Sequence, residues 1–131
     1  MSDPRVVRAQ ALHWEIEALR QLGAHHAALN VKHREAAGLL EERAREVLGQ
    51  RDALGWTDLF AAVTHWAEAG ERRRAEALLR FGESCVGDFP DGADSLRNEL
   101  DELRAWLKGL AVVPSLSEFA RDLPPVPRMA A

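Results

Sequence analysis

The chain has 131 residues, of which 47% are hydrophobic and 29% charged, and its formal net charge is −4. This composition is that of a folded globular protein rather than a disordered one, and the length fits one domain with a single core. Nucleic acid is disfavoured as a partner, because binding phosphates requires concentrated positive charge. Cys85 is the only cysteine, so it has no internal disulfide partner, and we expect a buried thiol in a reducing compartment.

The first ten residues, MSDPRVVRAQ, lack the apolar core of a signal peptide, and no apolar run approaches the length that spans a membrane. We therefore expect a cytoplasmic protein with no membrane partner. Arginine far outnumbers lysine and alanine is abundant, which is typical of a GC-rich bacterial genome and has no functional meaning here.

The first predicted helix begins at Ser2 or Asp3, has Pro4 at its first helical position, and ends at Leu22, before Gly23. Its helical wheel shows two apolar stripes. One stripe contains Val7, Ala11, Trp14, Ala18 and Leu22, and the other contains Leu12, Ile16 and Leu19. Two stripes predict two packing partners, so this helix is expected between neighbours rather than at an edge.

The second predicted helix runs from Ala24 to about Leu48. Its inner face contains Leu29, Ala36, Leu40, Ala44 and Val47. Gly38 weakens this helix. The alternative is one continuous helix over 4–48 that tolerates Gly23 in its interior.

Two shorter helical patterns meet at Gly70, after a loop over 49–56 with Thr57 as the helix N-cap. The first pattern places Leu59, Ala62, Val63 and Trp66 on one side of a helix, and the second does the same with Ala75, Leu78, Leu79, Gly82 and Val86. Two helices that close around one glycine run antiparallel and face each other. The pattern therefore predicts a helical hairpin on which the neighbouring helices stack.

The segment DFPDG ends this hairpin, and a last long helix is expected to start near Asp94 or Ser95. Its stripe contains Leu96, Leu100, Leu103, Leu107 and Leu110, which indicates an amphipathic helix that caps the bundle, with a short coiled coil as the alternative. Ser115 and Glu118 form a capping box, which predicts a short helix over 116–122. The sequence thus predicts an all-α domain over 1–123, a bundle of stacked antiparallel helical hairpins with five main helices and a short C-terminal one, followed by an extended Pro-containing tail over 124–131.

A weak internal repeat relates the two halves of this bundle at an offset of 47 residues, which superposes Gly23 on Gly70. The same offset superposes Leu12 on Leu59, Ile16 on Val63, Leu19 on Trp66, and Ala28 on Ala75. An aromatic residue four positions before the turn glycine and an alanine five positions after it, here Trp66, Gly70 and Ala75, resemble the tetratricopeptide-repeat (TPR) family. The resemblance covers mainly residues 59–90. It implies a TPR-like helical fold that binds a peptide or protein in a concave groove.

Polar side chains interrupt the apolar face of the second helix at His26, Asn30 and His33. Polar groups that point toward a core need partners, so these residues form either a metal or acid–base site, or a hydrogen-bonded structural cluster. Neither the Glu-x-x-His pairing of bundle metal sites nor HExxH occurs, and we predict no metal and no cofactor. His13 and His65 each stand alone on their helices.

The spacing of Arg20 and His25 or His26, and of Arg8 and His13, resembles the Arg–His motif of HEPN-type ribonucleases. With so many arginines in the chain, such a spacing is expected by chance. Arg72, Arg73 and Arg74 form the only basic run, which indicates either a site for an acidic partner or a solvated turn with local ion pairs.

Tryptophans are the remaining candidates for contacts with a partner. Trp14, Trp66 and Trp106 fall on or beside apolar stripes and are expected between helices, and Trp56 is expected to pack on the start of the third helix. An exposed tryptophan would mark an interface.

These features predict a non-enzymatic protein–protein interaction or adaptor module. It is expected to bind a protein or peptide in a groove between the first and third helices, and to form a homodimer through the last helix or an exposed aromatic patch. The candidate binding residues are Trp14, His26, Asn30, His33, Trp66, Arg72, Arg73 and Arg74. The alternative is a small all-α enzyme or metal-binding protein, HEPN-like or histidine-based, centred on His26 and His33.

Overall fold

Five α-helices make up the part of the chain that the computed structural model describes, residues 3–112. They are α1 (Pro4–Gln21), α2 (His26–Gly49), α3 (Gly55–Glu68), α4 (Arg72–Cys85) and α5 (Ala93–Val112). Two single-turn 3₁₀ helices, η1 (Val86–Asp88) and η2 (Pro90–Gly92), connect α4 to α5, and no strand occurs within residues 3–112. The all-α prediction is confirmed, whereas the helix expected over 116–122 and the tail over 124–131 lie outside the described residues.

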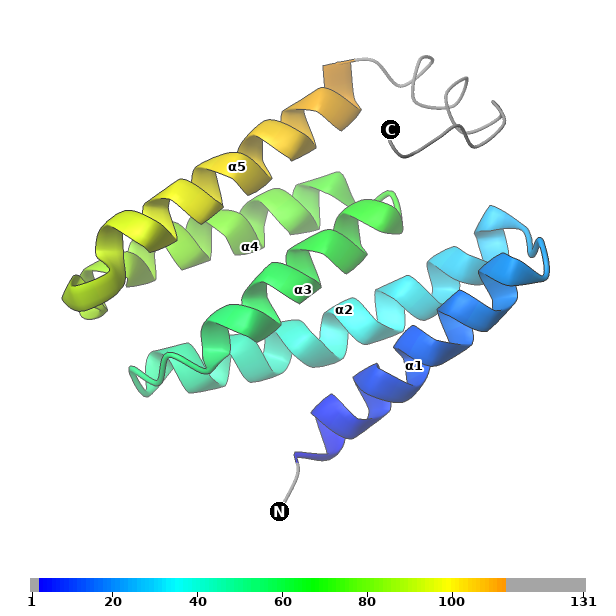
Figure 1. The fold of residues 1–131 in the computed structure, drawn as a ribbon, viewed down its shortest axis with the longest axis horizontal. Coiled ribbons are helices and arrows are strands. Elements are labelled where there is room, and N and C mark those ends of the chain that lie inside the picture. Colours follow the sequence, from blue (N-terminus) through cyan, green and yellow to red (C-terminus); the bar gives the residue numbers. More distant parts are fainter. Residues whose placement is uncertain (1–2, 113–131) are drawn as a thin grey trace.

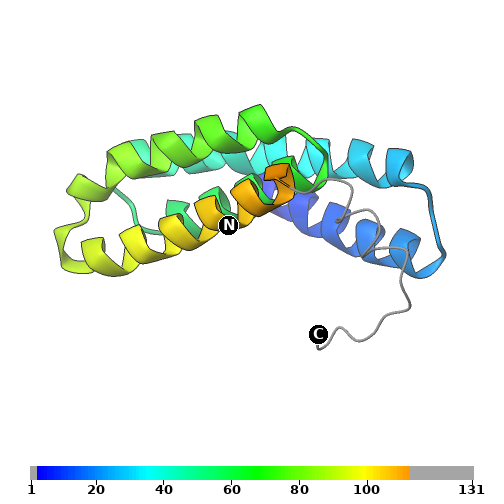
Figure 2. The same cartoon turned by 90° about the horizontal axis from the view of Figure 1, so that it is seen from above.

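Each helix packs against its neighbours in the chain, most extensively α2 against α3, so the helices cross the molecule in chain order, with α1 at one edge and α5 at the other (Figure 1). Seen along the perpendicular direction, α2 and α4 form one layer, and α1, α3 and α5 form the other (Figure 2). The bundle therefore consists of antiparallel hairpins, as the sequence predicts, with a two-layer alternation of odd and even helices.

The turns of the α1–α2 and α3–α4 hairpins are built in the same way. Gly23 and Gly70 have backbone φ angles of 76° and 80°, in the left-handed region that glycine adopts without strain. The amide after each glycine donates to a helix carbonyl five residues earlier, Ala24 to Leu19 (3.0 Å) and Glu71 to Trp66 (2.8 Å). Both predicted turns are thus confirmed, and the alternative of a continuous helix through Gly23 is wrong.

The facing sides of the α3–α4 hairpin form the centre of the core. Every residue predicted for them is buried: Leu59, Ala62, Val63, Trp66, Ala75, Leu78, Leu79, Gly82 and Val86. A Cβ atom on Gly82 would lie 3.1 Å from Leu59 Cδ1 and 3.4 Å from Leu100 Cδ2, so the missing side chain lets α3 and α5 approach α4 closely. Leu40 and Leu48 of α2, and Leu100 and Leu107 of α5, extend the same core outward.

Only one of the two predicted stripes of α1 is buried. Leu12 and Ile16 are buried, whereas the large side chains of the other stripe face solvent, with exposed fractions of 55% for Val7, 63% for Trp14 and 82% for Leu22. The prediction that α1 lies between two neighbours is therefore wrong. A helical wheel detects apolar stripes, but α1 is the edge of the stack and has α2 as its main neighbour.

The start of α3 also differs from the prediction. Thr57 is not the N-cap, because the helix already begins at Gly55 and Thr57 is an exposed residue of its first turn. The turn before the helix is held by Asp52, whose Oδ1 accepts a hydrogen bond from the Leu54 amide (3.0 Å). Trp56 is buried as expected, with its ring against those of Phe60 and Phe89.

Candidate partner-binding groove

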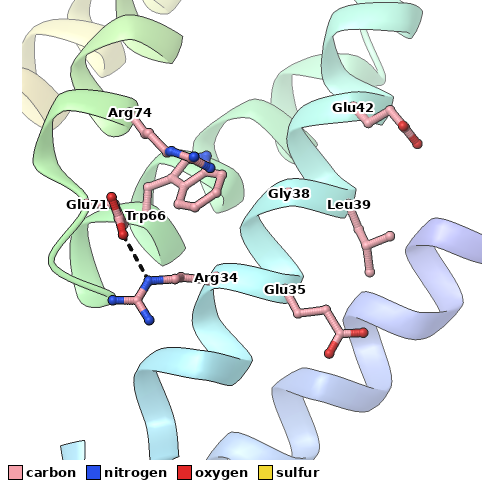
Figure 3. A pocket seen from close by; sticks show the side chains of 8 residues that line it. All are labelled: Arg34, Glu35, Gly38, Leu39, Glu42, Trp66, Glu71 and Arg74. Atoms are coloured by element: carbon pink, nitrogen blue, oxygen red, sulfur yellow. Dashed lines mark hydrogen bonds and ion pairs between the residues drawn. The ribbon is translucent and has the colours of Figure 1, made fainter. Parts of the chain in front are cut away.

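An open groove with a volume of about 530 Å³ runs between α2 and the start of α4 (Figure 3). We call it the α2–α4 groove. Its lining residues are Arg34, Glu35, Gly38, Leu39, Glu42, Trp66, Glu71 and Arg74. Its place differs from that of the groove expected between the first and third helices, because its lining comes from α2, from Trp66 of α3, and from Glu71 and Arg74 at the start of α4, with no residue of α1.

Gly38 leaves the groove open at its middle. This residue is exposed in the interior of α2, and a Cβ atom at this position would meet no atom within 4 Å. Glycine in a helix interior destabilises the helix by roughly 1 kcal/mol relative to alanine. No close packing requires glycine here, so the consequence of the missing side chain is free space above the α2 backbone.

Trp66 and Arg74 form the wall of the groove on the side of α3 and α4 (Figure 3). The guanidinium carbon of Arg74 lies 4.7 Å from the centre of the Trp66 ring, a cation–π arrangement. The indole N–H of Trp66 donates to Glu41 Oε1 (2.8 Å), which fixes the ring plane from the side of α2. The indole is buried, and the cation that covers it faces the groove.

The charged groups of the groove differ in how they are paired. Arg34 Nε donates to Glu71 Oε2 at 2.9 Å across the groove (Figure 3). The other two glutamates are paired with α1, Glu35 with Arg8 (3.0 Å) and Glu42 with Arg5 (3.3 Å). Within residues 3–112, Arg74 has no carboxylate partner in the groove or beside it. The groove therefore presents an unneutralised guanidinium on an aromatic surface.

The arginine run separates into residues with different surroundings. Arg74 points along Trp66 into the groove, whereas Arg72 turns back to Glu76 of its own helix (3.0 Å) and Arg73 is exposed. Of the candidate binding residues, the structure brings Trp66 and Arg74 together in the groove. Trp14 is an exposed residue of α1, and α2 and α3 lie between α1 and α4 in the stack (Figure 1).

The histidine and asparagine candidates lie where α2 packs on α3, not in the groove. His33 is 5% exposed, and its Nδ1 lies 2.8 Å from Nδ1 of His65, so the N–H of one ring donates a hydrogen bond to the other ring. When the side-chain amide of Asn30 is assigned with its nitrogen toward α3, it donates to the main-chain carbonyls of Glu68 and His26, both at 3.2 Å. His26 itself is exposed. The contacts of His33 with His65 and of Asn30 with Glu68 join α2 to α3, whereas the contact of Asn30 with His26 lies within α2.

Burial lowers the pKa of both paired histidines. Desolvation is the main cause for His65, whose pKa falls to about 4, and the neighbouring His33 and His13 lower it further. For His33, desolvation again comes first, followed by the positive charge of Arg20, while Glu17 opposes the shift. The pair is therefore neutral at pH 7. Within residues 3–112, no group of three or more side chains has an arrangement suited to a metal ion.

Two polar contacts that helical periodicity does not predict join α3 to α2, and α2 to the N-cap of α1. The buried carboxylate of Asp58 accepts a hydrogen bond from Arg43, and Arg43 Nε lies 3.3 Å from Asp3 Oδ2. Burial raises the pKa of Asp58, and the charge of Arg43 opposes this rise. Asp58 lies four residues before Ala62, and this helical spacing places its side chain on the buried side of α3. The spacing could therefore have identified Asp58 as a buried carboxylate that needs a partner. His65 directly precedes Trp66 and is not part of the predicted apolar face. The sequence therefore does not indicate that His65 contacts a residue of α2.

Comparisons with models of protein families, with curated proteins and with solved structures give no match to this chain. None of the helices within residues 3–112 combines the length and apolar character needed to cross a bilayer. The function is therefore inferred from the chain's own geometry.

Proposed function

We propose that this chain is a non-enzymatic, TPR-like interaction module that binds a peptide or protein segment in the α2–α4 groove. The observation that carries the proposal is the unpaired guanidinium of Arg74, held on Trp66 beside the open space above Gly38. The TPR resemblance of Trp66, Gly70 and Ala75 supports it, as do the matching turns of the two hairpins.

The groove favours a partner segment with two features. A carboxylate on the segment pairs with Arg74, because an arginine on an aromatic face is held ready for a charge-assisted hydrogen bond. An apolar side chain fills the space over Gly38 beside Leu39, where it makes contacts that water cannot make. The lining contains no histidine, cysteine, serine or threonine, and each of its three glutamates is already paired with an arginine, which favours recognition over acid–base or nucleophilic chemistry.

The test is selection of random peptides on the full-length protein, followed by binding measurements on the selected peptides by fluorescence polarisation. We expect enrichment of acidic residues next to an apolar one. Substitution Gly38→Trp fills the groove and Arg74→Glu reverses its charge, and each is expected to weaken binding by about tenfold or more, equivalent to about 1.4 kcal/mol.

Gly38→Ala is the matched control. Alanine leaves most of the groove open, so peptide affinity stays within about twofold, while the free energy of unfolding rises by roughly 1 kcal/mol because alanine is the better helix former. If selection enriches no peptide, or if enriched peptides bind the Gly38→Trp variant as well as the original protein, the groove is not the binding site.

A further inference from the structure

The outer face of α1 carries an apolar stripe that no other helix within residues 3–112 covers. Its residues are Val7, Ala11, Trp14, Ala18 and Leu22, and the three large ones are more than half exposed. The opposite side of the helix buries Leu12 and Ile16. An edge helix of a helical stack is normally polar on its outer side, so a stripe of this length indicates a surface that another molecule covers.

The order of side chains along the stripe is the same from both ends. It begins and ends with a large aliphatic residue, has Trp14 at the middle, and has an alanine on each side of the tryptophan. A twofold axis near Trp14, perpendicular to α1, would place Val7 opposite Leu22 of a second copy and Ala11 opposite Ala18 of that copy. An interface between identical chains must be self-complementary in this way.

The two alanines permit close contact. Ala11 and Ala18 are seven residues apart, so they lie on one line along the helix, which is the repeat of residues at a helix–helix seam. Small residues on such a line let two helix backbones approach, and the indoles then cover the gap on either side. A tryptophan that is 63% exposed becomes the central anchor of such an interface.

The charges beside the stripe are already paired within one chain. Glu15 lies 2.7 Å from Lys32, Arg8 pairs with Glu35, and Glu17 pairs with Arg20. No unpaired charge beside the stripe therefore repels an identical surface, and none within residues 3–112 attracts a partner of opposite charge. This charge balance favours a second copy over a charged protein as the occupant.

We propose that the outer face of α1 binds the same face of a second copy, forming a twofold antiparallel dimer centred on Trp14. One helix face buries less than the roughly 1,200 Å² of a standard interface. Interfaces below this size are typical of weak, reversible association, so we expect a monomer–dimer equilibrium rather than a permanent dimer.

Sedimentation equilibrium of the full-length protein tests this proposal. We expect a monomer–dimer equilibrium that Trp14→Glu shifts by at least tenfold toward monomer. Val31→Glu and Trp106→Glu are the matched controls, since each places the same charge at an exposed apolar residue on another helix, 61% exposed in α2 and 37% exposed in α5. Circular dichroism verifies that each variant is folded, because loss of helix would also abolish a dimer.

Cysteine cross-linking tests the antiparallel arrangement. A mixture of Ala11→Cys and Ala18→Cys proteins is expected to form the mixed disulfide, and each protein alone is expected to form several-fold less, while native Cys85 is buried and serves as background. A protein that stays monomeric up to millimolar concentration overturns the proposal. So does a dimer that Trp106→Glu disrupts and Trp14→Glu does not, or a disulfide between two Ala11→Cys chains that exceeds the mixed one.

Discussion

Two hairpins of this chain turn through a left-handed glycine, at Gly23 and at Gly70, with the same pair of backbone hydrogen bonds. Beyond the turns they differ. The α3–α4 hairpin lies between α2 and α5, whereas the α1–α2 hairpin has one outer edge (Figure 1). Ala75 is buried after the second turn, while its counterpart Ala28 is exposed after the first. A shared local sequence pattern therefore specifies the turn, and the position in the stack decides which helix faces are covered.

The largest expected difference in stability is between two tryptophan variants, one in the interior hairpin and one on the edge helix α1. Trp66→Ala removes a side chain that is 4% exposed and its hydrogen bond to Glu41, so we expect a loss of about 3–5 kcal/mol in the free energy of unfolding. Trp14→Ala changes an exposed side chain and is expected to alter it by less than about 0.5 kcal/mol. Urea denaturation at low protein concentration measures both. Similar losses for the two variants would contradict the assignment of α1 as an edge.

The paired histidines link α2 to the interior hairpin and make this contact sensitive to acid. The pKa of His65 is about 4 in the folded protein and near 6.5 in the unfolded chain, so below pH 6.5 the unfolded state binds more protons. The free energy of unfolding is therefore not reduced by His65 above pH 6.5. It decreases as the pH falls from 6.5 toward 4, by an amount on the order of 2 kcal/mol. Denaturation at a series of pH values measures it.

Hydrogen bonds from Arg5 lower the pKa of Asp3 from 3.8 to about 2, so the stability that Asp3 contributes is lost below this window. The pKa of Glu15 is lowered by Lys32 and that of the buried Asp58 is raised, and both carboxylates remain in the histidine variants, so comparison with the original protein isolates the histidine contribution. Replacing both His33 and His65 by leucine is expected to flatten the profile between pH 6.5 and 4. The control His26→Ala removes an exposed histidine and leaves the profile unchanged. An acid-sensitive double variant would show that other groups are responsible.

The smallest effects come from the left-handed turn residues. Gly70→Ala places a Cβ atom at a φ of 80° and is expected to destabilise the protein by about 1 kcal/mol. After α2 the corresponding position is occupied by Arg51, with a φ of 60°, so Arg51→Gly is expected to stabilise it by a similar amount. Thermal unfolding of the two variants should shift in opposite directions. A lower melting temperature for Arg51→Gly would mean that contacts of the arginine side chain stabilise the protein by more than the left-handed backbone at this position destabilises it.

The sequence alone determined the local features of this protein. Helical periodicity identified nine buried residues of the α3–α4 hairpin and the turn after it, glycine identified two turns, and Ser2 or Asp3 followed by Pro4 marked the start of α1. These predictions succeed because apolar spacing, backbone freedom and helix capping depend on residues within a few positions of one another.

Only the tertiary structure decided which surfaces meet. It placed Trp66 and Arg74 at a groove between α2 and α4, paired His33 with His65, joined Asp58 to Arg43, and left the Trp14 stripe of α1 in solvent. Each of these contacts depends on where a distant helix lies. A pattern within one helix shows that a face is apolar, but the stacking order of the helices determines whether anything covers that face.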